Sequence, residues 1–107
     1  MREMTVQEVN RYLKNNSTPP LLLDVRESWE YNICHLPNVR LIPVRNVASA
    51  LADLDREQEI IVICHHGVRS RLIANFLEQQ QGFKNVINMQ GGMAAWSRDV
   101  DFSVATY

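Results

Sequence analysis

Four short, mostly apolar runs recur along the chain, and none of them shows the strict alternation of a half-exposed strand. These runs are Leu21–Val25, Val39–Ile42, Ile60–Ile63 and Val86–Met89. Continuous apolar segments of this length are typical of strands buried on both faces of a parallel sheet. The pattern therefore predicts that the chain builds a parallel sheet from these segments.

Between the strands, apolar residues recur every three or four positions, which is the spacing of one helix face. The predicted helices cover about 6–15, about 44–54 and a third stretch that follows Ser70 and ends before Gly82, with shorter ones over 27–33 and 91–96. Thr5 and Glu8 form a capping box that starts the first helix, and Gly82 is placed to end the third. Strands that alternate with helices imply one doubly wound α/β domain, with its sheet covered on both faces.

The sequence also predicts the burial of three large apolar side chains and the character of the last segment. Within 27–33, Trp29 and Ile33 are expected to face the core, and Trp96 is likewise expected to be a core residue. Residues 97–107 show no clear period and receive no secondary structure. We expect a single domain over 1–107, with a core of about 4–98 and a tail over 99–107.

The charge balance argues against two classes of partner. A formal net charge of −1 gives no electrostatic basis for binding nucleic acid or an acidic membrane. No apolar run approaches the roughly 20 residues that span a bilayer, and no apolar signal core follows Met1. Two cysteines are too few for a disulfide framework. We therefore expect a reduced, cytoplasmic protein with no nucleic-acid or membrane partner.

The candidate reactive residues lie where the strand Ile60–Ile63 is followed by Cys64 and, a few residues later, by a helix. Backbone N–H groups converge in such a turn, and a helix N-terminus adds partial positive charge. Both effects stabilise a thiolate, so Cys64 is the candidate nucleophile. The alternative is an inert core thiol, but a core thiol needs neither Gly67 nor Arg69 after it.

The segment Cys64-His65-His66-Gly67-Val68-Arg69-Ser70 resembles the active-site loop of the rhodanese (sulfurtransferase) family. Further resemblances follow in the family's order: Leu22–Glu27, Cys34–Pro43 and the Gly-Gly-x-x-Ala-Trp of Gly91–Trp96. Cys34 and Asn38 depart from the pattern, since the family usually has glycine there. Asn tolerates a positive φ and Cys is strained by it, so the geometry of this turn is open.

The resemblance implies a three-layer α/β/α fold around a central, mostly parallel sheet of about five short strands. It also implies that Cys64 takes sulfane sulfur from thiosulfate or a related small anionic donor, holds it as a persulfide, and passes it to cyanide or a thiol. The loop from His65 to Ser70 would bind the substrate, and no cofactor is implied. A sulfur-relay protein is a further possible partner.

Two other function classes remain as alternatives. A cysteine phosphatase or arsenate reductase needs a longer cradle, Cys-x5-Arg, whereas here only four residues separate Cys64 from Arg69. That loop length favours sulfur transfer over phosphoryl chemistry. A sulfur-relay or protein-interaction module with little turnover of its own would carry the same loop, and the sequence does not separate it from an enzyme.

The remaining loop residues have both structural and functional interpretations. Arg69 either attracts an anionic donor or bonds the carbonyls of its own loop, and we favour a role in the site. Ser70 is expected to cap the helix that follows. His65 and His66 either add positive potential or simply decorate the loop.

Residues outside the loop also have a structural and a functional interpretation. Asp24 and Arg26 lie at the carboxyl edge of the sheet, where a supporting structural role is favoured, with Arg26 pairing with an acid such as Glu30. Cys34 is a candidate resolving thiol for Cys64. The histidines and cysteines lack the usual two-residue gaps of zinc sites, so no metal is expected.

Overall fold

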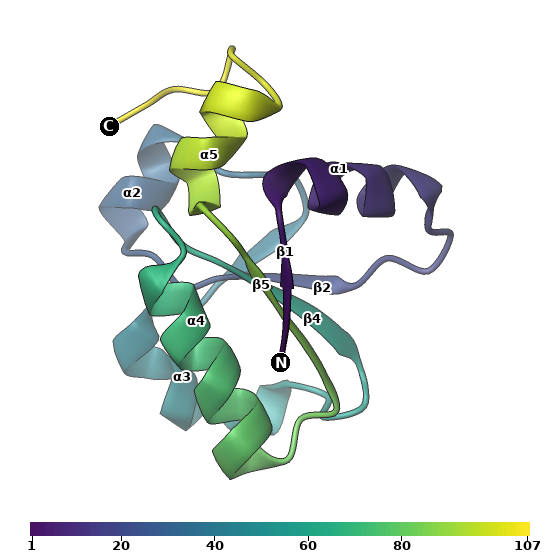
Figure 1. Ribbon diagram of the computed structural model, residues 1–107. Helices are drawn as coiled ribbons and strands as arrows, with labels where there is room; N and C mark the ends of the chain where they lie inside the picture. Colours follow the sequence, from purple (N-terminus) through teal and green to yellow (C-terminus); the bar gives the residue numbers. More distant parts are fainter.

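The computed structural model describes all 107 residues, and its ten principal elements alternate between strand and helix (Figure 1). In chain order they are β1 Arg2–Met4, α1 Val6–Asn15, β2 Leu21–Asp24, α2 Ser28–Ile33, β3 Val39–Leu41, α3 Val44–Ala50, β4 Glu59–Ile63, α4 Val68–Asn75, β5 Asn85–Met89 and α5 Gly92–Asp99. A 3-10 turn, Leu51–Asp53, extends α3, and a π-helical turn, Phe76–Gln80, extends α4.

The five strands form one sheet in the order β1-β5-β4-β2-β3, and every pair is parallel. β4 is the central strand, with β2 and β5 beside it. This arrangement confirms the predicted α/β class and the parallel sheet. Because β4 is flanked on both sides, the residue that follows it emerges in the middle of the carboxyl edge of the sheet.

Alternate residues of β4 face two separate apolar clusters. Ile60 and Val62 belong to the cluster beneath α3 and α4, whereas Ile61 and Ile63 belong to the cluster beneath α1 and α5. Figure 1 shows the two pairs of helices on opposite sides of the sheet. The double burial explains why this strand is apolar at every position.

Two predicted helix boundaries are confirmed by their caps. Helix α1 spans Val6–Asn15, and its capping box is present in both directions, from Thr5 to Glu8 and back. At the end of the α4 segment, Gly82 takes a φ of +74°, and the N–H of Phe83 donates to the carbonyl of Leu77. A glycine with positive φ closes a helix in this way.

The predicted orientation of α2 is wrong. Trp29 and Ile33 are exposed, at 59% and 39%, while Glu30 is buried at 3%. Helix α2 has only six residues, and Glu30 turns inward to bind Arg69 of α4 and Tyr107 of the tail, so these polar contacts set the rotation of the helix. Trp96, in contrast, is buried at 8%, as predicted.

Strand β1 was not predicted. Arg2–Met4 contains no apolar run, and its register on β5 pairs Arg2 with Ile87 and Met4 with Met89. Edge strands of this kind are short and partly exposed, so their sequences carry little hydrophobic signal. This strand forms because its backbone pairs with that of β5, which is distant in the sequence.

The turn after α2 accommodates both departures from glycine. Asn38 adopts a φ of +62°, which an asparagine tolerates, whereas Cys34 has an extended φ of −162° that strains no residue. Both substitutions are therefore compatible with the turn. No helix has the length and apolar character needed to cross a membrane.

Candidate functional site

The candidate site lies at the turn between β4 and α4. Gly67 is the N-cap of α4 and takes a φ of +92°, a conformation that glycine adopts without strain. A Cβ at this position would also lie 3.0 Å from the backbone nitrogen of Gly91. Glycine therefore allows the chain to reverse tightly beside Cys64, which brings the start of α4 back over the thiol.

Two backbone N–H groups are directed at the sulfur of Cys64. The amide of Gly67 donates to Sγ over 3.1 Å, and the amide of Ser70 over 3.3 Å. The thiol itself is 1% exposed and also contacts the apolar cluster beneath α3 and α4. It thus has a buried position together with the donors that a thiolate requires. The amides of Val68 and Arg69, in the first turn, have no partner within the helix.

Ser70 does not cap α4, contrary to the prediction, because Gly67 holds that position. Its side chain is fully buried, and the Cys64 thiol donates to its Oγ over 3.3 Å. Its own hydroxyl donates to Oδ1 of Asn88 on β5. Asn88 in turn donates to the carbonyl of Gly67 over 3.3 Å and to Glu3 over 3.1 Å. These contacts hold the hydroxyl of Ser70 beside the sulfur.

The first turn of α5 fixes the other side of the loop. The amide of Met93 donates to the carbonyl of Cys64 over 2.9 Å, and the amide of Ala94 to that of His65 over 3.0 Å. A Cβ on Gly92 would lie 2.3 Å from the carbonyl oxygen of Cys64. The paired glycines at the start of α5 thus allow its unpaired amides to reach the loop.

Arg69 leaves the loop and binds α2. Its Nη1 and Nη2 atoms donate to the two carboxylate oxygens of Glu30, over 2.7 and 2.8 Å. Of the two interpretations of Arg69, the bonding of carbonyls in its own loop is not observed. This guanidinium, with smaller help from the amide of Glu27, lowers the pKa of Glu30 to about 2 despite burial. The carboxylate beside the loop is consequently ionised throughout the neutral range.

Asp24 and Arg26 form a second buried pair at the same edge of the sheet. Arg26 Nη2 lies 2.8 Å from Asp24 Oδ2, and both side chains are essentially inaccessible. The carboxylate also accepts the backbone N–H of Arg26. The predicted acid partner, Glu30, is wrong, because Arg26 reaches only the backbone carbonyl of that residue. Asp24, two residues away, satisfies the guanidinium instead.

The unassigned tail returns to the site through Tyr107. The hydroxyl of this residue donates to Glu30 Oε2 over 2.9 Å and accepts from Arg26 Nη1 over 3.0 Å. Its ring lies 4.0 Å from the ring of His65 in a stacked arrangement and 5.7 Å from Trp29 in an edge contact. Burial is the main cause that raises the pKa of Tyr107 to about 12, so the phenol keeps its proton.

His65 and His66 differ in their surroundings. His66 is exposed, whereas His65 is partly covered and its Nδ1 has no hydrogen-bond partner. Burial, followed by the neighbouring His66, lowers the pKa of His65. The predicted positive potential is therefore reduced at His65.

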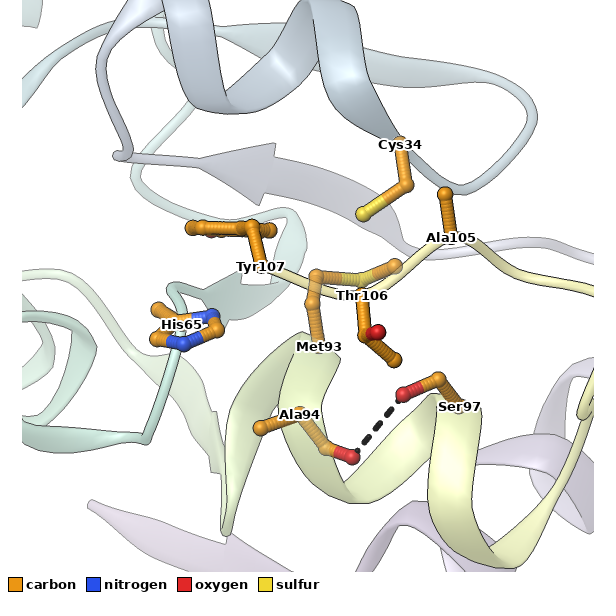
Figure 2. Close-up of a pocket in the computed structure, with 8 residues that line it drawn as sticks. All are labelled: Cys34, His65, Met93, Ala94, Ser97, Ala105, Thr106 and Tyr107. Atoms are coloured by element: carbon orange, nitrogen blue, oxygen red, sulfur yellow. Dashed lines mark hydrogen bonds between the residues drawn. The ribbon is translucent and has the colours of Figure 1, made fainter.

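Next to His65 lies a small pocket of about 70 Å3 (Figure 2). Its lining residues are Cys34, His65, Met93, Ala94, Ser97, Ala105, Thr106 and Tyr107. Cys34 directs its sulfur into this pocket, 3.8 Å from Arg26 Nη1. Both cysteines are free thiols, and the role of Cys34 as a resolving thiol stays a prediction.

Three residues of the site were not selected from the sequence. Glu30, Asn88 and Tyr107 each contact a loop residue from a distant part of the chain. Asn88 offered one signal, since a polar residue inside a buried strand needs a partner. Glu30 was expected only as a partner of Arg26, and Tyr107 offered no signal, because a tyrosine in an aperiodic tail is an ordinary surface residue.

Comparison with known proteins gives a consistent result. The family described as Rhodanese-like domain matches residues 5–99. The chain is 33% identical over 76 residues to "Thiosulfate sulfurtransferase GlpE" of Pseudoalteromonas translucida, a match that covers 71% of each chain. It is 43% identical over 76 residues to "Putative sulfur carrier protein YrkF" of Bacillus subtilis, which covers 71% of this chain and 40% of the relative.

A solved structure of similar fold supports the same family. The rhodanese-like domain protein from Staphylococcus aureus superposes with a TM-score of 0.83 at 31% identity, covering 90% of this chain and 91% of that one. Several relatives are much longer. The chain covers only 30% of "Rhodanese-like/PpiC domain-containing protein 12, chloroplastic" of Arabidopsis thaliana, to which it is 42% identical over 90 residues.

Proposed function

From the premise that the chain belongs to the rhodanese-like domain family over residues 5–99, we propose that it is a sulfurtransferase whose Cys64 carries sulfane sulfur as a persulfide. One observation supports this most directly: the amides of Gly67 and Ser70 both donate to the Cys64 sulfur at the start of α4. Donors in this arrangement stabilise the thiolate, which is the nucleophilic form of cysteine.

The proposed first step forms one S–S bond and breaks another. With thiosulfate, the Cys64 thiolate attacks the outer sulfur, and the S–S bond of the donor breaks with its electron pair leaving on sulfite. The outer sulfur remains on Cys64 as a persulfide. In the second step cyanide or a thiol attacks this sulfur, and the thiolate of Cys64 is regenerated. No proton or external electron is needed for either transfer.

The loop residues are assigned to holding the outer sulfur. The free first-turn amides of Val68 and Arg69 are proposed to bind that atom, as those of Gly67 and Ser70 bind Sγ. His65 would contribute backbone rather than charge, since burial lowers its pKa. Asp24 and Arg26 support the edge of the sheet through their buried pair.

The test is intact-mass analysis after treatment with thiosulfate. We expect the wild-type protein to gain the mass of one sulfur atom and to lose it when cyanide is added. Cys64→Ser should abolish the gain, whereas the matched control Cys34→Ser should keep it. An equal gain in Cys64→Ser would show that sulfur is carried elsewhere. If the protein hydrolyses an aryl phosphate faster than it converts cyanide to thiocyanate, a phosphatase would be favoured.

A sulfur-relay role is the second candidate, and the similarity to a protein named as a putative sulfur carrier favours it. A relay would accept sulfur from a protein persulfide and turn over thiosulfate and cyanide slowly. Measuring the transfer rate with thiosulfate and with a protein persulfide distinguishes an enzyme from a relay.

The two free thiols support our proposal that the protein works in a reducing, cytoplasmic compartment. Its proposed partners are sulfur donors and acceptors rather than nucleic acid or membrane.

A further inference from the structure

We propose that Glu30 determines which sulfur donor this site accepts: by neutralising Arg69, it favours organic persulfides, R–S–SH, over dianionic thiosulfate. This inference rests on the proposed function, in which Cys64 is the sulfur carrier. It goes beyond that function by assigning donor selection to a residue of α2 that lies outside the loop.

The geometry of the ion pair leaves Arg69 little freedom to bind a donor. Both terminal nitrogens of the guanidinium are engaged by the two oxygens of Glu30, over 2.7 and 2.8 Å. The Arg69 side chain is 37% exposed, whereas that of Glu30 is only 4% exposed. A dianion that approaches the loop therefore meets a cation whose charge is already balanced by a buried carboxylate.

Glu30 is itself held in place by two further contacts. Its Oε1 accepts the backbone N–H of Glu27, and its Oε2 accepts the hydroxyl of Tyr107. That hydroxyl also accepts from Arg26, which is paired with Asp24. Since Glu30 is fixed from three sides, the carboxylate stays where it is when a donor arrives. Arg69 would have to break a bidentate contact to bind an anion.

The other arginines of the neighbouring elements are paired as well. Arg26 binds Asp24, Arg45 binds Glu27, and Arg71 binds Glu3. Among the arginines of the β2–α2 turn, α3 and α4, every guanidinium has a carboxylate partner. The attraction for a donor must therefore come mainly from backbone amides, which carry only partial positive charge.

The surface beside the loop suits an organic group. Val68 in the loop is 62% exposed, and Trp29, which touches Tyr107, is 59% exposed. Thiosulfate offers these side chains no apolar surface, whereas the carbon chain of a persulfide does. A small thiol persulfide and a persulfide on a protein share this chemistry.

The transfer balances without a co-reactant. The Cys64 thiolate attacks the outer sulfur of R–S–SH, and the S–S bond of the donor breaks with its electron pair leaving on R–S⁻. A new S–S bond joins the outer sulfur, with its hydrogen, to Cys64. The negative charge of the Cys64 thiolate leaves on R–S⁻, and Cys64 keeps an uncharged persulfide, so atoms and charge balance.

The test compares kcat/KM for thiosulfate with that for the persulfide of 2-mercaptoethanol, whose organic group is uncharged. We expect the wild type to prefer the persulfide and Glu30→Gln to raise the ratio of thiosulfate to persulfide kcat/KM by about tenfold or more. Asp99→Asn is the matched control, because it removes the same charge from an exposed pair on α5. Its ratio should stay at the wild-type value.

A double variant tests whether the charge of Arg69 produces the gain. In Glu30→Gln/Arg69→Gln the increase in the ratio should disappear. A merely structural role of Glu30 would slow both donors together and leave the ratio unchanged, which would overturn the inference. A third arm with a persulfide on a model protein distinguishes the two donor sources, since a higher kcat/KM there than with the small persulfide identifies a protein donor.

If Glu30→Gln does not fold, the salt dependence of the wild-type protein still tests the inference. Its thiosulfate kcat/KM should change little between about 20 mM and about 500 mM salt, because the arginines beside the loop are all paired with carboxylates. A steep fall with salt, or a preference for thiosulfate, would overturn the inference while leaving Cys64 as the carrier. Absence of transfer from every donor would instead overturn the proposed function.

Discussion

Around the sulfur of Cys64, single hydrogen bonds determine which groups reach the reactive atom. The hydroxyl of Ser70 lies 3.3 Å from the sulfur, and Asn88, which accepts from it, holds it there. Asn88 also binds the carbonyl of Gly67, so one buried amide connects β5 to both ends of the turn. A serine that the sequence suggests as a helix cap is thus a neighbour of the thiol.

Ser70→Ala tests this arrangement at the residue scale. The amide of Ser70 is retained, but the hydroxyl is lost and Oδ1 of the buried Asn88 has no donor. We expect a loss of about 1–3 kcal/mol in the free energy of unfolding. Alkylation of Cys64 by iodoacetamide at neutral pH should become several-fold faster, because the thiol loses the oxygen to which it donates its proton. Ser49→Ala, which removes an exposed hydroxyl bonded to Asn46, is the control. Unchanged stability and reactivity in Ser70→Ala would contradict the assignment.

Helices contribute to the site mainly through their first turns. Helix α4 directs the amides at its N-terminus to the sulfur, and α5 directs its own to the carbonyls of Cys64 and His65. Helix α2 instead contributes a buried carboxylate from its inner face. The turn is thus held from both faces of the sheet, because α4 and α5 pack on opposite sides of it.

Gly92→Ala tests the contact between α5 and the turn. The new methyl group would lie 2.3 Å from the carbonyl of Cys64 at a φ of +58°, so α5 must move away. We expect a loss of more than about 2 kcal/mol and a lower rate of sulfur transfer, measured by urea unfolding and thiocyanate formation. Gly82→Ala is the matched control: its φ is also positive, but nothing lies within 4 Å of the new group. It should cost only about 1 kcal/mol. Equal losses would show that backbone strain alone is responsible.

Across the whole molecule, ion pairs connect segments that the sheet does not join. Glu30 binds Arg69 of α4 and Tyr107 of the tail, and Tyr107 binds Arg26 after β2. Glu30 and Arg26 are buried and Arg69 is half-buried, so the loss of one charge leaves its partner without compensation. The stability of the folded chain should therefore depend on the ionisation of Glu30.

The pH dependence of stability follows from the low pKa of Glu30. The folded protein keeps this carboxylate ionised down to about pH 2, whereas the unfolded chain takes up a proton near the ordinary value of 4.5. The stabilisation is complete above about 4.5 and is lost as the pH falls toward 2. We expect about 2 kcal/mol to disappear in this window, since the partly exposed Arg69 allows solvent to screen the pair.

Urea unfolding of the wild type and Glu30→Gln at about pH 5 and about pH 2.5 measures this contribution. The other carboxylates titrate in both proteins, so their effects cancel in the difference. The advantage of the wild type should shrink toward the lower pH. A constant difference would mean that the ion pair does not contribute to the acid sensitivity.

Local sequence alone determined the strand, thiol, glycine and helix around Cys64, and the capping box of α1. In each case the residues that specify the geometry lie within a few positions of one another, so periodicity and backbone preference were sufficient. The positive φ of Gly82 was predictable in the same way, since it is a property of the residue and its turn. The doubly wound fold class followed from the alternation of these local signals.

Only the tertiary structure decided the side chains that surround the thiol. Glu30 and Arg69 are 39 positions apart, and Tyr107 and Glu30 are 77 positions apart. Periodicity placed Trp29 inward, but the energetic demand of a buried ion pair turned Glu30 inward instead. Strand β1 likewise depends on β5 for its hydrogen bonds. Contacts between distant segments leave no period in the sequence, because each partner is specified only once the chain has folded.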